Sequence, residues 1–263
     1  VIMACRNLDK AQEARKNIIK VIPNADLEVM SLDLTSLQSV REFAALFIQK
    51  HSRLDLLIAN AGIMIPPFSK TKEGFESQFG VNYLAHFLLT NLLFPIIKNT
   101  PSSRIVLLSS IAHRKGEINF DNLNAEKGYS KMAAYSQSKL ACLMFAYELQ
   151  RRLEKSDGST IAVAAHPGVS HTNLMQHIPK FLMAIGSPLF SFFMHSPEKG
   201  SLPTLMASIG TEVKGGDYYG PTGFKEMTGL PGLVKSEPQS HDIEVAKKLW
   251  EVSEKLTGEK FTV

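Results

Sequence analysis

Tyr135 and Lys139 stand four residues apart and are the first pair of side chains that could do chemistry. Residues four apart lie on one face of a helix, so the ammonium group would stand beside the phenol. A free phenol has a pKa near 10, and a neighbouring cation favours its ionised form. Shifting a phenol by two or three units takes about 3–4 kcal/mol, at about 1.36 kcal/mol per unit. The pair is suited to proton exchange with an alcohol or carbonyl, although alone it is also typical of a helix surface.

Three further polar motifs follow apolar runs of the kind that form buried strands. In an open α/β sheet, ligands bind outside the carboxyl ends of the strands, which is where these motifs fall. The motifs are Asn60-Ala61-Gly62, Ser109-Ser110, and the segment from Pro167 and Gly168 to His171 and Thr172.

Short apolar runs alternate with longer amphipathic stretches over the first two thirds of the sequence. The expected strands are Val1–Ala4, Leu27–Leu32, Leu54–Ala59, Arg104–Ser109 and Thr160–Ala165. The expected helices are 8–20, 36–51, 73–98 and 132–155. The runs are apolar almost throughout, as in strands that are covered on both faces. The alternation predicts an α/β fold with a doubly wound, Rossmann-type parallel sheet and helices on both faces.

The remainder of the chain is less regular. A helix is expected at 197–210, a short strand at 217–219, a Gly/Pro loop up to 238 and a closing helix at 241–257. We find no repeat, no low-complexity segment and no linker. The sequence therefore reads as one domain over residues 1–263.

Composition excludes several classes of protein. The 263 residues are 44% apolar and carry a net charge of +4 without a basic run, which disfavours a nucleic-acid partner. Cys5 and Cys142 belong to no paired motif, which favours a reducing, cytoplasmic location. The sequence contains no metal-ligand spacing of a known kind and no signal peptide at its start. The apolar stretch 178–194 is too short and too interrupted for a confident membrane span.

Taken in order, the motifs closely resemble the short-chain dehydrogenase/reductase family over nearly the whole chain. Asp33-Leu34 and the segment around Asn82, Val81–Phe87, also fall in the family's order. Some details resemble the retinol dehydrogenase subgroup, and protochlorophyllide reductases are the second choice. The subgroup details are Ala4-Cys5-Arg6-Asn7, Ser110-Ile111-Ala112-His113, the long spacing from Ser110 to Tyr135, and Ala246-Lys247-Lys248-Leu249-Trp250.

The resemblance implies a hydride-transfer enzyme with four catalytic residues. Tyr135 would be the general acid/base, and Lys139 would also hold the nicotinamide ribose. Ser110 would donate to the substrate carbonyl, and Asn82 would belong to a proton relay. Structural roles stay open for these residues: Ser110 could cap the end of a strand, as serines often do, and Asn82 could simply interrupt a helix and bond to backbone groups. His113, His166 and His171 are weaker candidates for a base, since no carboxylate partner is evident for them.

The same resemblance implies a cofactor site and favours NADP (NADPH). Cys5 stands where the family's NAD-dependent members have an acidic residue, and it is followed by Arg6, whose guanidinium suits a 2′-phosphate. Asp33 would accept from the adenine, unless it caps a helix in competition with Thr35 or Ser36. The other cofactor-binding candidates are Asn60, Ala61, Gly62, Tyr135, Lys139, Pro167, Gly168 and Thr172.

The family's opening strand and its Thr-Gly-x-x-x-Gly-x-Gly turn do not occur in the sequence. Val1–Ala4 already matches the family's second strand. The absent strand would lie in the middle of the sheet, so a gap with unpaired backbone groups is expected there. The turn would supply the amides that hold a pyrophosphate. We therefore expect the sequence to be an N-terminally truncated piece of a longer protein.

The segment 170–196 matches the family's variable substrate lid. Its apolar side chains suit a lipophilic alcohol or carbonyl such as a retinoid, a steroid or a xenobiotic ketone, or else they form core or an oligomer contact. Weak membrane association and a homo-oligomer stay open. The alternative functions are an inactive Rossmann-fold interaction protein and a protochlorophyllide-type reductase. The apolar residues are Met175, Phe181, Leu182, Met183, Phe190, Phe192, Phe193 and Met194.

Overall fold

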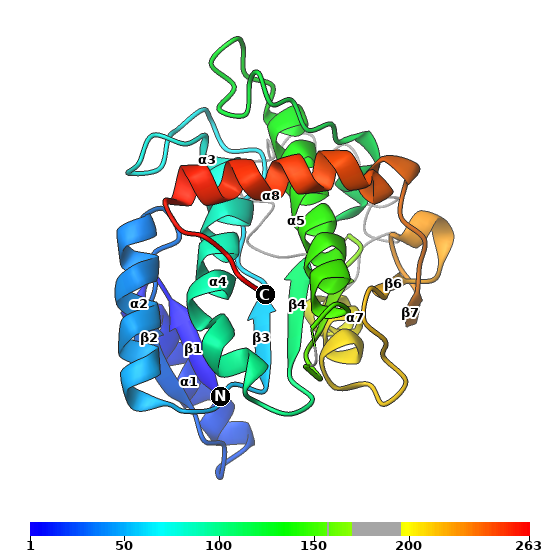
Figure 1. Cartoon of the computed structure of the whole chain (residues 1–263). Coiled ribbons are helices and arrows are strands. Elements are labelled where there is room, and N and C mark those ends of the chain that lie inside the picture. Colours follow the sequence, from blue (N-terminus) through cyan, green and yellow to red (C-terminus); the bar gives the residue numbers. More distant parts are fainter. Residues whose placement is uncertain (157, 170–195) are drawn as a thin grey trace.

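The computed structural model describes residues 1–156, 158–169 and 196–263 (Figure 1). Strands and helices alternate along the chain, so the expected α/β fold is confirmed. The strands are β1 Ile2–Cys5, β2 Glu28–Ser31, β3 Leu56–Ala59, β4 Arg104–Leu108, β5 Ile161–Ala165, β6 Tyr218–Pro221 and β7 Pro231–Leu233. The α-helices are α1 Leu8–Val21, α2 Leu37–Lys50, α3 Ser77–Phe79, α4 Ala85–Lys98, α5 Lys131–Leu153, α7 Pro197–Ile209 and α8 Ile243–Thr257. Shorter helical segments are η1 Gly80–Leu84, η2 Ile111–Lys115, η4 Phe224–Glu226 and η5 Pro238–His241.

The strands form two separate hydrogen-bonded sheets. One is the parallel pair β1–β2, and the other has the order β3-β4-β5-β6-β7. All pairings are parallel except β6 with β7, which is antiparallel. The expected loop up to residue 238 therefore contains a strand that the sequence did not reveal, because Gly and Pro at 229–232 are typical of turns.

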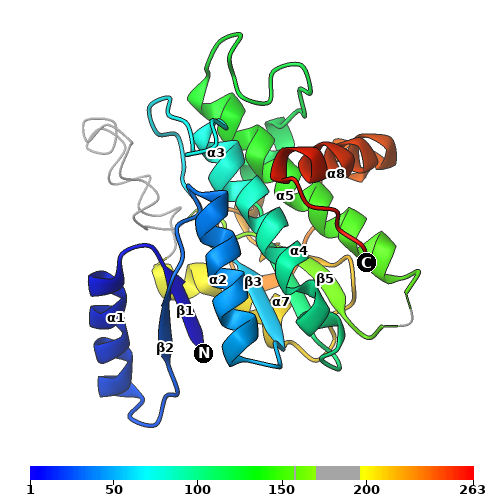
Figure 2. The ribbon, with the colours of Figure 1, turned by 60° about the vertical axis from the view of Figure 1, so that its left-hand side comes forward.

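The division falls between β1 and β3, where the sequence predicts a gap. β3 pairs with β4 on one side and with no described strand on the other, and β1 pairs with β2 alone among the described strands. Ile58 in β3 is 39% exposed, whereas β4 and β5 are buried after their first residue. Figure 2 shows α1 beside β1 and β2 at the margin of the molecule, away from α5.

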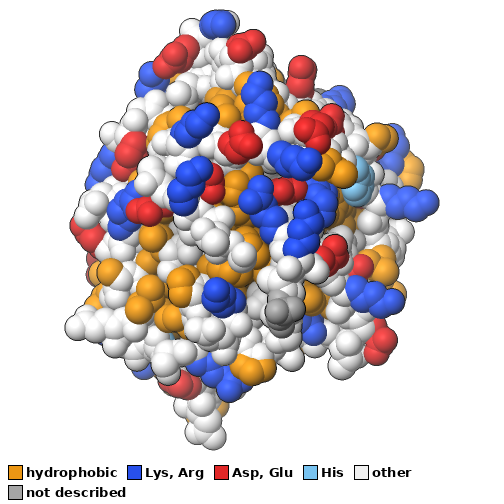
Figure 3. All heavy atoms as spheres, viewed as in Figure 1, with side chains coloured by type: hydrophobic (Ala, Val, Ile, Leu, Met, Phe, Trp, Pro, Cys, Tyr) orange, Lys and Arg blue, Asp and Glu red, His pale blue; other side chains and the backbone are white. Residues whose placement is uncertain are grey.

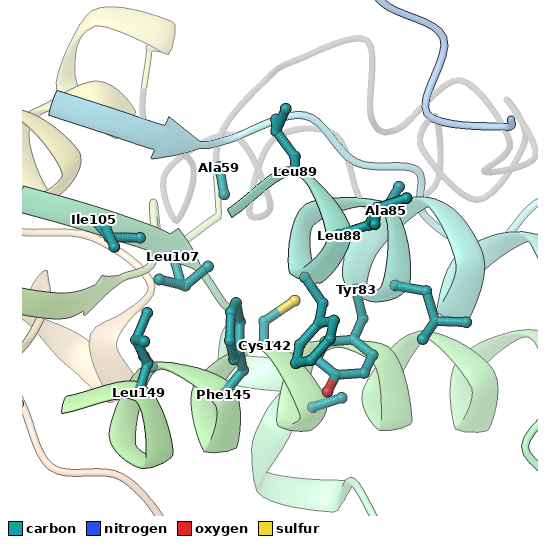
Figure 4. Close-up of a cluster of buried hydrophobic side chains, with 14 of the residues drawn as sticks. Ala59, Tyr83, Ala85, Leu88, Leu89, Ile105, Leu107, Cys142, Phe145 and Leu149 are labelled. Carbon is teal, nitrogen blue, oxygen red and sulfur yellow. The ribbon is translucent and has the colours of Figure 1, made fainter. Parts of the chain in front are cut away.

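The main core lies between the larger sheet and the helices α4 and α5. Figure 4 shows Leu107 of β4 facing Phe145 of α5, with Tyr83 between the two helices. Phe261, near the end of the sequence, is buried and its ring stacks on Trp250 of α8, 4.7 Å between centroids. Figure 3 shows charged side chains of both signs over the outer surface of α8. The apolar side of α8 therefore closes the core, and its charged side faces solvent.

The helix expected at 73–98 is divided in the structure. It begins at Ser77 after a cap by the Glu76 carboxylate, and Gly80–Leu84 forms a π-helical turn before α4. The run Ser77–Lys98 is long and apolar enough to cross a membrane, and 78% of its apolar window is buried within the structure. Its apolar surface thus packs inside the fold. The π-turn widens the helix at Asn82, and such turns are often found at functional sites.

Candidate active site

Tyr135 and Lys139 lie one turn apart on α5, as the sequence predicts. Ser130 caps the helix by accepting from the Ala133 amide, which places the pair in the second and third turns. Tyr135 is 4% exposed and Lys139 is 5% exposed. The Lys139 Nζ lies 6.0 Å from the centre of the Tyr135 ring. A buried cation therefore stands beside the phenol.

Lys139 also connects α5 to the strand that precedes the two serines. Its Nζ donates to the Leu108 carbonyl at 3.0 Å, and Leu108 is the last residue of β4. A lysine ammonium has three N–H donors, so two remain for other acceptors. The buried carbonyl fixes the ammonium at the carboxyl end of β4.

Ser109 and Ser110 have different surroundings. The Ser109 hydroxyl is buried and donates to the Lys139 carbonyl at 2.8 Å, so it joins β4 to α5. Ser110 is partly exposed, and its Oγ accepts from the Ala112 amide at 3.2 Å, capping η2. The cap uses the oxygen and leaves the hydroxyl proton for another acceptor. The two serines therefore differ: the Ser109 hydroxyl proton is used within the fold, whereas the Ser110 hydroxyl proton is not engaged by a described residue.

Asn82 holds the loop after β3 against α5. Its Oδ1 accepts from the Ile63 amide at 2.8 Å, and its Nδ2 donates to the Ile63 carbonyl at 2.9 Å. The same Nδ2 donates to the Ser138 hydroxyl at 3.0 Å. Both amide protons are therefore engaged. The backbone carbonyl of Asn82, which lies in the π-helical turn, accepts from the Cys142 thiol at 3.1 Å.

The Asn60-Ala61-Gly62 loop passes close to Lys139. A Cβ at Gly62 would lie 3.0 Å from the Asn82 Oδ1 and 3.6 Å from the Lys139 Nζ, so a glycine permits this approach. Asn60 and Ala61 continue the chain directly from β3. His86 of α4 contacts the Ala61 carbonyl through its Nε2 at 2.8 Å.

His86 is a residue of the site region that the sequence analysis did not single out. Burial, the largest cause, and the charge of Lys139 lower its pKa to about 4, although the hydrogen bond to the Ala61 carbonyl acts in the opposite direction. The imidazole is therefore neutral at physiological pH, and its Nε2–H donates to Ala61. The available signal was its place one helical turn after Asn82, on the same helix face.

Arg6 and Asp33 follow the two strands of the smaller sheet. Arg6 is exposed and comes directly after β1. Asp33 follows β2, and its Oδ1 accepts from the amide and the hydroxyl of Thr35 at 3.0 and 2.8 Å. Ser36, not Asp33, caps α2. Arg6 and Asp33 thus stand at the carboxyl ends of their strands, where a nucleotide would bind.

Pro167 and Gly168 form the turn after β5. Gly168 has φ +69°, and a Cβ there would overlap the Met227 carbonyl, so the turn requires glycine. The Gly168 amide donates to the His166 Nδ1 at 3.2 Å. Thr172, His171 and the expected lid at 170–196 lie outside the described residues, apart from Ser196.

A carboxylate contacts one of the three histidines considered in the sequence analysis, contrary to expectation. The His166 Nε2 lies 3.2 Å from the Glu226 Oε2. The two residues are 60 positions apart; His166 directly follows β5 and Glu226 ends η4, so no local pattern links them. Burial lowers the pKa of His166 and also that of His113.

Comparisons with known proteins identify relatives over nearly the whole chain. The model of the short chain dehydrogenase family matches residues 1–182. Retinol dehydrogenase 14 of Mus musculus is 41% identical, covering 98% of this chain and 78% of that protein. Retinol dehydrogenase 13 of Homo sapiens is 42% identical, covering 98% and 77%. These similarities place the chain near the retinol dehydrogenases.

Solved structures agree with this result. An uncharacterised protein from Mycobacterium paratuberculosis has a TM-score of 0.81 at 39% identity, covering 100% of this chain and 85% of that one. The NADP active-site complex of Pseudomonas aeruginosa RhlG has a TM-score of 0.59 at 20% identity, covering 83% of each chain, and supports the fold alone. Family members are oxidoreductases that transfer a hydride with a nicotinamide cofactor. The chain belongs to the short-chain dehydrogenase family, in its retinol dehydrogenase-like subgroup.

Proposed function

We propose that the protein is an NADP(H)-dependent oxidoreductase that acts on a lipophilic alcohol or carbonyl compound. The observation that carries the proposal is the fixed Lys139 ammonium, which lies beside the Tyr135 ring and is bonded to the end of β4. Similarity to retinol dehydrogenases 13 and 14 supports a retinoid-like substrate. The proposed cytoplasmic location rests on the free cysteines Cys5 and Cys142.

The residues present fit the nicotinamide-ribose end of a dinucleotide. Lys139 has unused donors for ribose hydroxyls, and Gly62 leaves space beside its Nζ. The Pro167-Gly168 turn lies at the carboxyl end of the next strand along the sheet, since β4 pairs with β5. The sequence contains no glycine-rich turn for the pyrophosphate, so the fit concerns this end of the cofactor.

Tyr135 and Ser110 would act on the oxygen of the substrate. When bound, the cofactor supplies or accepts the hydride, and the protein supplies position and charge. The Tyr135 hydroxyl gives a proton to the oxygen in reduction and takes it back in oxidation. Lys139 stabilises the phenolate that results, because its charge is buried close to the ring. The Ser110 hydroxyl donates a hydrogen bond to the developing negative charge.

Asn82 is proposed chiefly as the clamp of the loop after β3. Its side-chain amide is engaged with Ile63 and Ser138, so proton transfer through that amide would break these bonds. The relay role expected from the family stays a prediction. Loss of the clamp would release Gly62 from its place beside Lys139.

Arg6 is proposed to select NADP over NAD. It is exposed at the end of β1, with its guanidinium available to a 2′-phosphate. Asp33, Asn60 and Ala61 would complete the adenosine side of the site. Thr172 is proposed from the sequence motif alone, because it lies outside the described residues.

Reduction of a substrate panel by NADPH and by NADH tests the function. We expect turnover of long apolar aldehydes or ketones with NADPH, and weaker turnover with NADH. Light should have no effect, which separates this activity from a protochlorophyllide-type reduction. Absence of any NADPH binding would contradict the proposal and favour a non-enzymatic interaction protein on the same fold.

A further inference from the structure

A partly buried charge network joins the segments that follow β4, β5 and β6. His166 is fully buried, and its Nε2 lies 3.2 Å from the Glu226 Oε2. The Glu226 Oε1 lies 2.8 Å from the Nη2 of Arg114, which belongs to η2, four residues after Ser110. The network therefore reaches from the Ser110 segment to the turn that holds Gly168.

The hydrogen bonds fix the tautomer of His166. Its Nδ1 accepts from the Gly168 amide at 3.2 Å, so Nδ1 carries no proton. The proton of the neutral ring is then on Nε2, where it donates to the Glu226 carboxylate. Both ring nitrogens are satisfied in this form alone. A second proton, on Nδ1, would point at the Gly168 N–H and break that bond.

The backbone around the pair is shaped to receive it. A Cβ at Gly220 of β6 would overlap the His166 Nε2, so a glycine lets the ring lie against that strand. Lys225 and Glu226 have φ of 49° and 58°, conformations that residues with a Cβ seldom adopt. The Val169 amide donates to the Met227 carbonyl at 2.9 Å. The turn after β5 and the η4 segment thus hold each other.

We propose that His166 and Glu226 are a positioning pair that holds the Pro167-Gly168 turn in the conformation that receives the cofactor. This inference rests on the proposed function, because that assigns the turn to cofactor binding. The His166 ring holds the Gly168 amide in place, and Glu226 selects the tautomer of the ring that can do so. His166 is not a general base, since neither ring nitrogen is free for a substrate. Protonation of His166 disconnects the turn.

Several charged or titratable groups surround His166 and bear on its protonation. Burial, the largest cause, lowers the pKa of His166, and the charge of Arg114 acts in the same direction, whereas Glu226 of η4 favours the protonated ring. His113 of η2 contacts the Ser110 carbonyl through its Nδ1 at 2.7 Å and accepts from the Glu237 amide at 3.3 Å. Glu237 lies 3.7 Å from Arg114, and the Tyr218 ring of β6 is 5.2 Å from His166.

Two substitutions of His166 separate its two hydrogen bonds. In His166→Asn, Oδ1 replaces Nδ1 and accepts from the amide two residues on, as in an Asx turn. In His166→Gln, the longer amide can still donate to Glu226, but the acceptor for Gly168 is lost. NADPH binding is followed by the fluorescence of the reduced nicotinamide. We expect the Kd for NADPH to rise about tenfold in His166→Gln and less than about threefold in His166→Asn. A tenfold change corresponds to the free energy of about one hydrogen bond.

Hydrogen exchange of the Gly168 amide, without cofactor, gives a second readout. It should accelerate in His166→Gln and stay slow in His166→Asn. In the steady state, His166→Gln should raise the KM for the cofactor and leave kcat nearly unchanged, because the turn contributes binding rather than chemistry. Equal effects of the two substitutions, or none in His166→Gln, would overturn the proposal.

The pH profile tests the role of the proton. In the wild type, affinity for NADPH should fall as the pH drops through the lowered pKa of His166, and His166→Asn should lack this component. His113→Asn, the control for the other buried histidine of the network, should keep it. Glu226→Gln keeps an acceptor but loses the charge, so it should move the component to lower pH. An unchanged profile in both His166→Asn and Glu226→Gln would contradict the inference.

The outcomes also separate this inference from the proposed function. A wild type that binds neither NADPH nor NADH would refute the proposed function. Hydrogen exchange of the Gly168 amide would still test whether His166 holds the turn. If His166→Gln binds NADPH as tightly as the wild type does, the positioning role of His166 is refuted and the proposed function is not.

Discussion

The smaller and larger sheets of the molecule contribute to one candidate site but are packed very differently. β4 and β5 are buried along nearly their whole length, and α5 behind them carries Tyr135 and Lys139 in the core. In β1 and β2 only Met30 is buried, and Ala11 alone is buried on α1. The proposed catalytic residues therefore lie on a closely packed framework, and Arg6 and Asp33, the candidates for binding the adenosine end of the cofactor, lie on a looser one.

This difference teaches that positioning and recognition are separable in this fold. The side chains of Asn82, Ser109 and Lys139 are tied by hydrogen bonds to neighbouring elements. Arg6 lies on an exposed strand end, where affinity can change without repacking. Substitutions in the larger unit, which is the sheet β3–β7 with the helices packed on it, should thus affect stability or chemistry strongly. Substitutions in the smaller unit, which is β1, β2 and α1, should affect mainly cofactor binding.

Phe261→Ala should show the largest difference in stability between the two units. The Phe261 ring is buried against Phe87, Phe94 and Trp250, so we expect a loss of about 3–5 kcal/mol. Val21→Ala at the end of α1 is the control, because this side chain is 81% exposed, and its effect should stay within about 0.5 kcal/mol. Urea unfolding measures both. Similar losses would remove the contrast between the units.

Lys139→Met should reduce the rate of reduction by about 10²–10³-fold. The reason is the loss of the buried positive charge beside the Tyr135 ring, and the expected fall in rate corresponds to about 3–4 kcal/mol in the activation free energy, at about 1.36 kcal/mol for each tenfold. Methionine keeps much of the length and apolar volume of the side chain. Turnover with NADPH measures the effect, and circular dichroism checks the fold. A fall in rate of less than about threefold would show that the Lys139 charge does not support the Tyr135 phenolate.

His86→Gln should make stability less dependent on acid pH. Burial lowers the pKa of His86 to about 4, against about 6.5 in the unfolded chain. The unfolded state therefore binds the proton first, and stability falls as the pH drops from about 6.5 towards 4, by about 3 kcal/mol. Glutamine keeps a donor for the Ala61 carbonyl and does not titrate.

The difference between wild type and His86→Gln isolates this histidine, because His113 and His166 titrate in both proteins. Urea midpoints at pH 7 and near pH 4.5 give the comparison. Parallel losses in the two proteins would show that His86 is not held neutral by the fold.

Arg6→Ala should change cofactor choice with the smallest energetic effect of these substitutions. We expect NADPH to bind about tenfold more weakly, and NADH to bind as before, because NADH lacks the 2′-phosphate. The unfolding midpoint should be unchanged, since Arg6 is exposed. Fluorescence titration with both cofactors measures this. Equal weakening for NADH would indicate that the substitution disturbs the β1–β2 unit itself.

Much of the fold follows from local patterns in the sequence. The strand–helix alternation predicts the order of elements, and the spacing of Tyr135 and Lys139 predicts their shared face. The absent opening strand predicts the interruption between β1 and β3. These features depend on periodicity and chain order, which are local or fixed by topology.

Contacts across long loops could not be predicted in this way. β7 consists of Pro231, Gly232 and Leu233, which locally favour a turn, and its pairing with β6 makes it a strand. The carboxylate partner of His166 comes from an η4 residue with a positive φ. The two hydrogen bonds between the Asn82 side chain and the Ile63 backbone come from a π-helical turn that hydrophobic periodicity does not reveal.

The central claim is that the Tyr135 hydroxyl transfers the proton on the packed side of the molecule. The most direct measurement is the single-turnover rate of NADPH oxidation after mixing with a saturating lipophilic aldehyde, in wild type and Tyr135→Phe. Phenylalanine keeps the ring and removes the proton. The account predicts a rate lower by at least about 10²-fold, as expected for loss of a general acid, and a smaller change in the Kd for NADPH, because Tyr135 is one of several candidate cofactor contacts. A rate within about threefold of the wild type would contradict it.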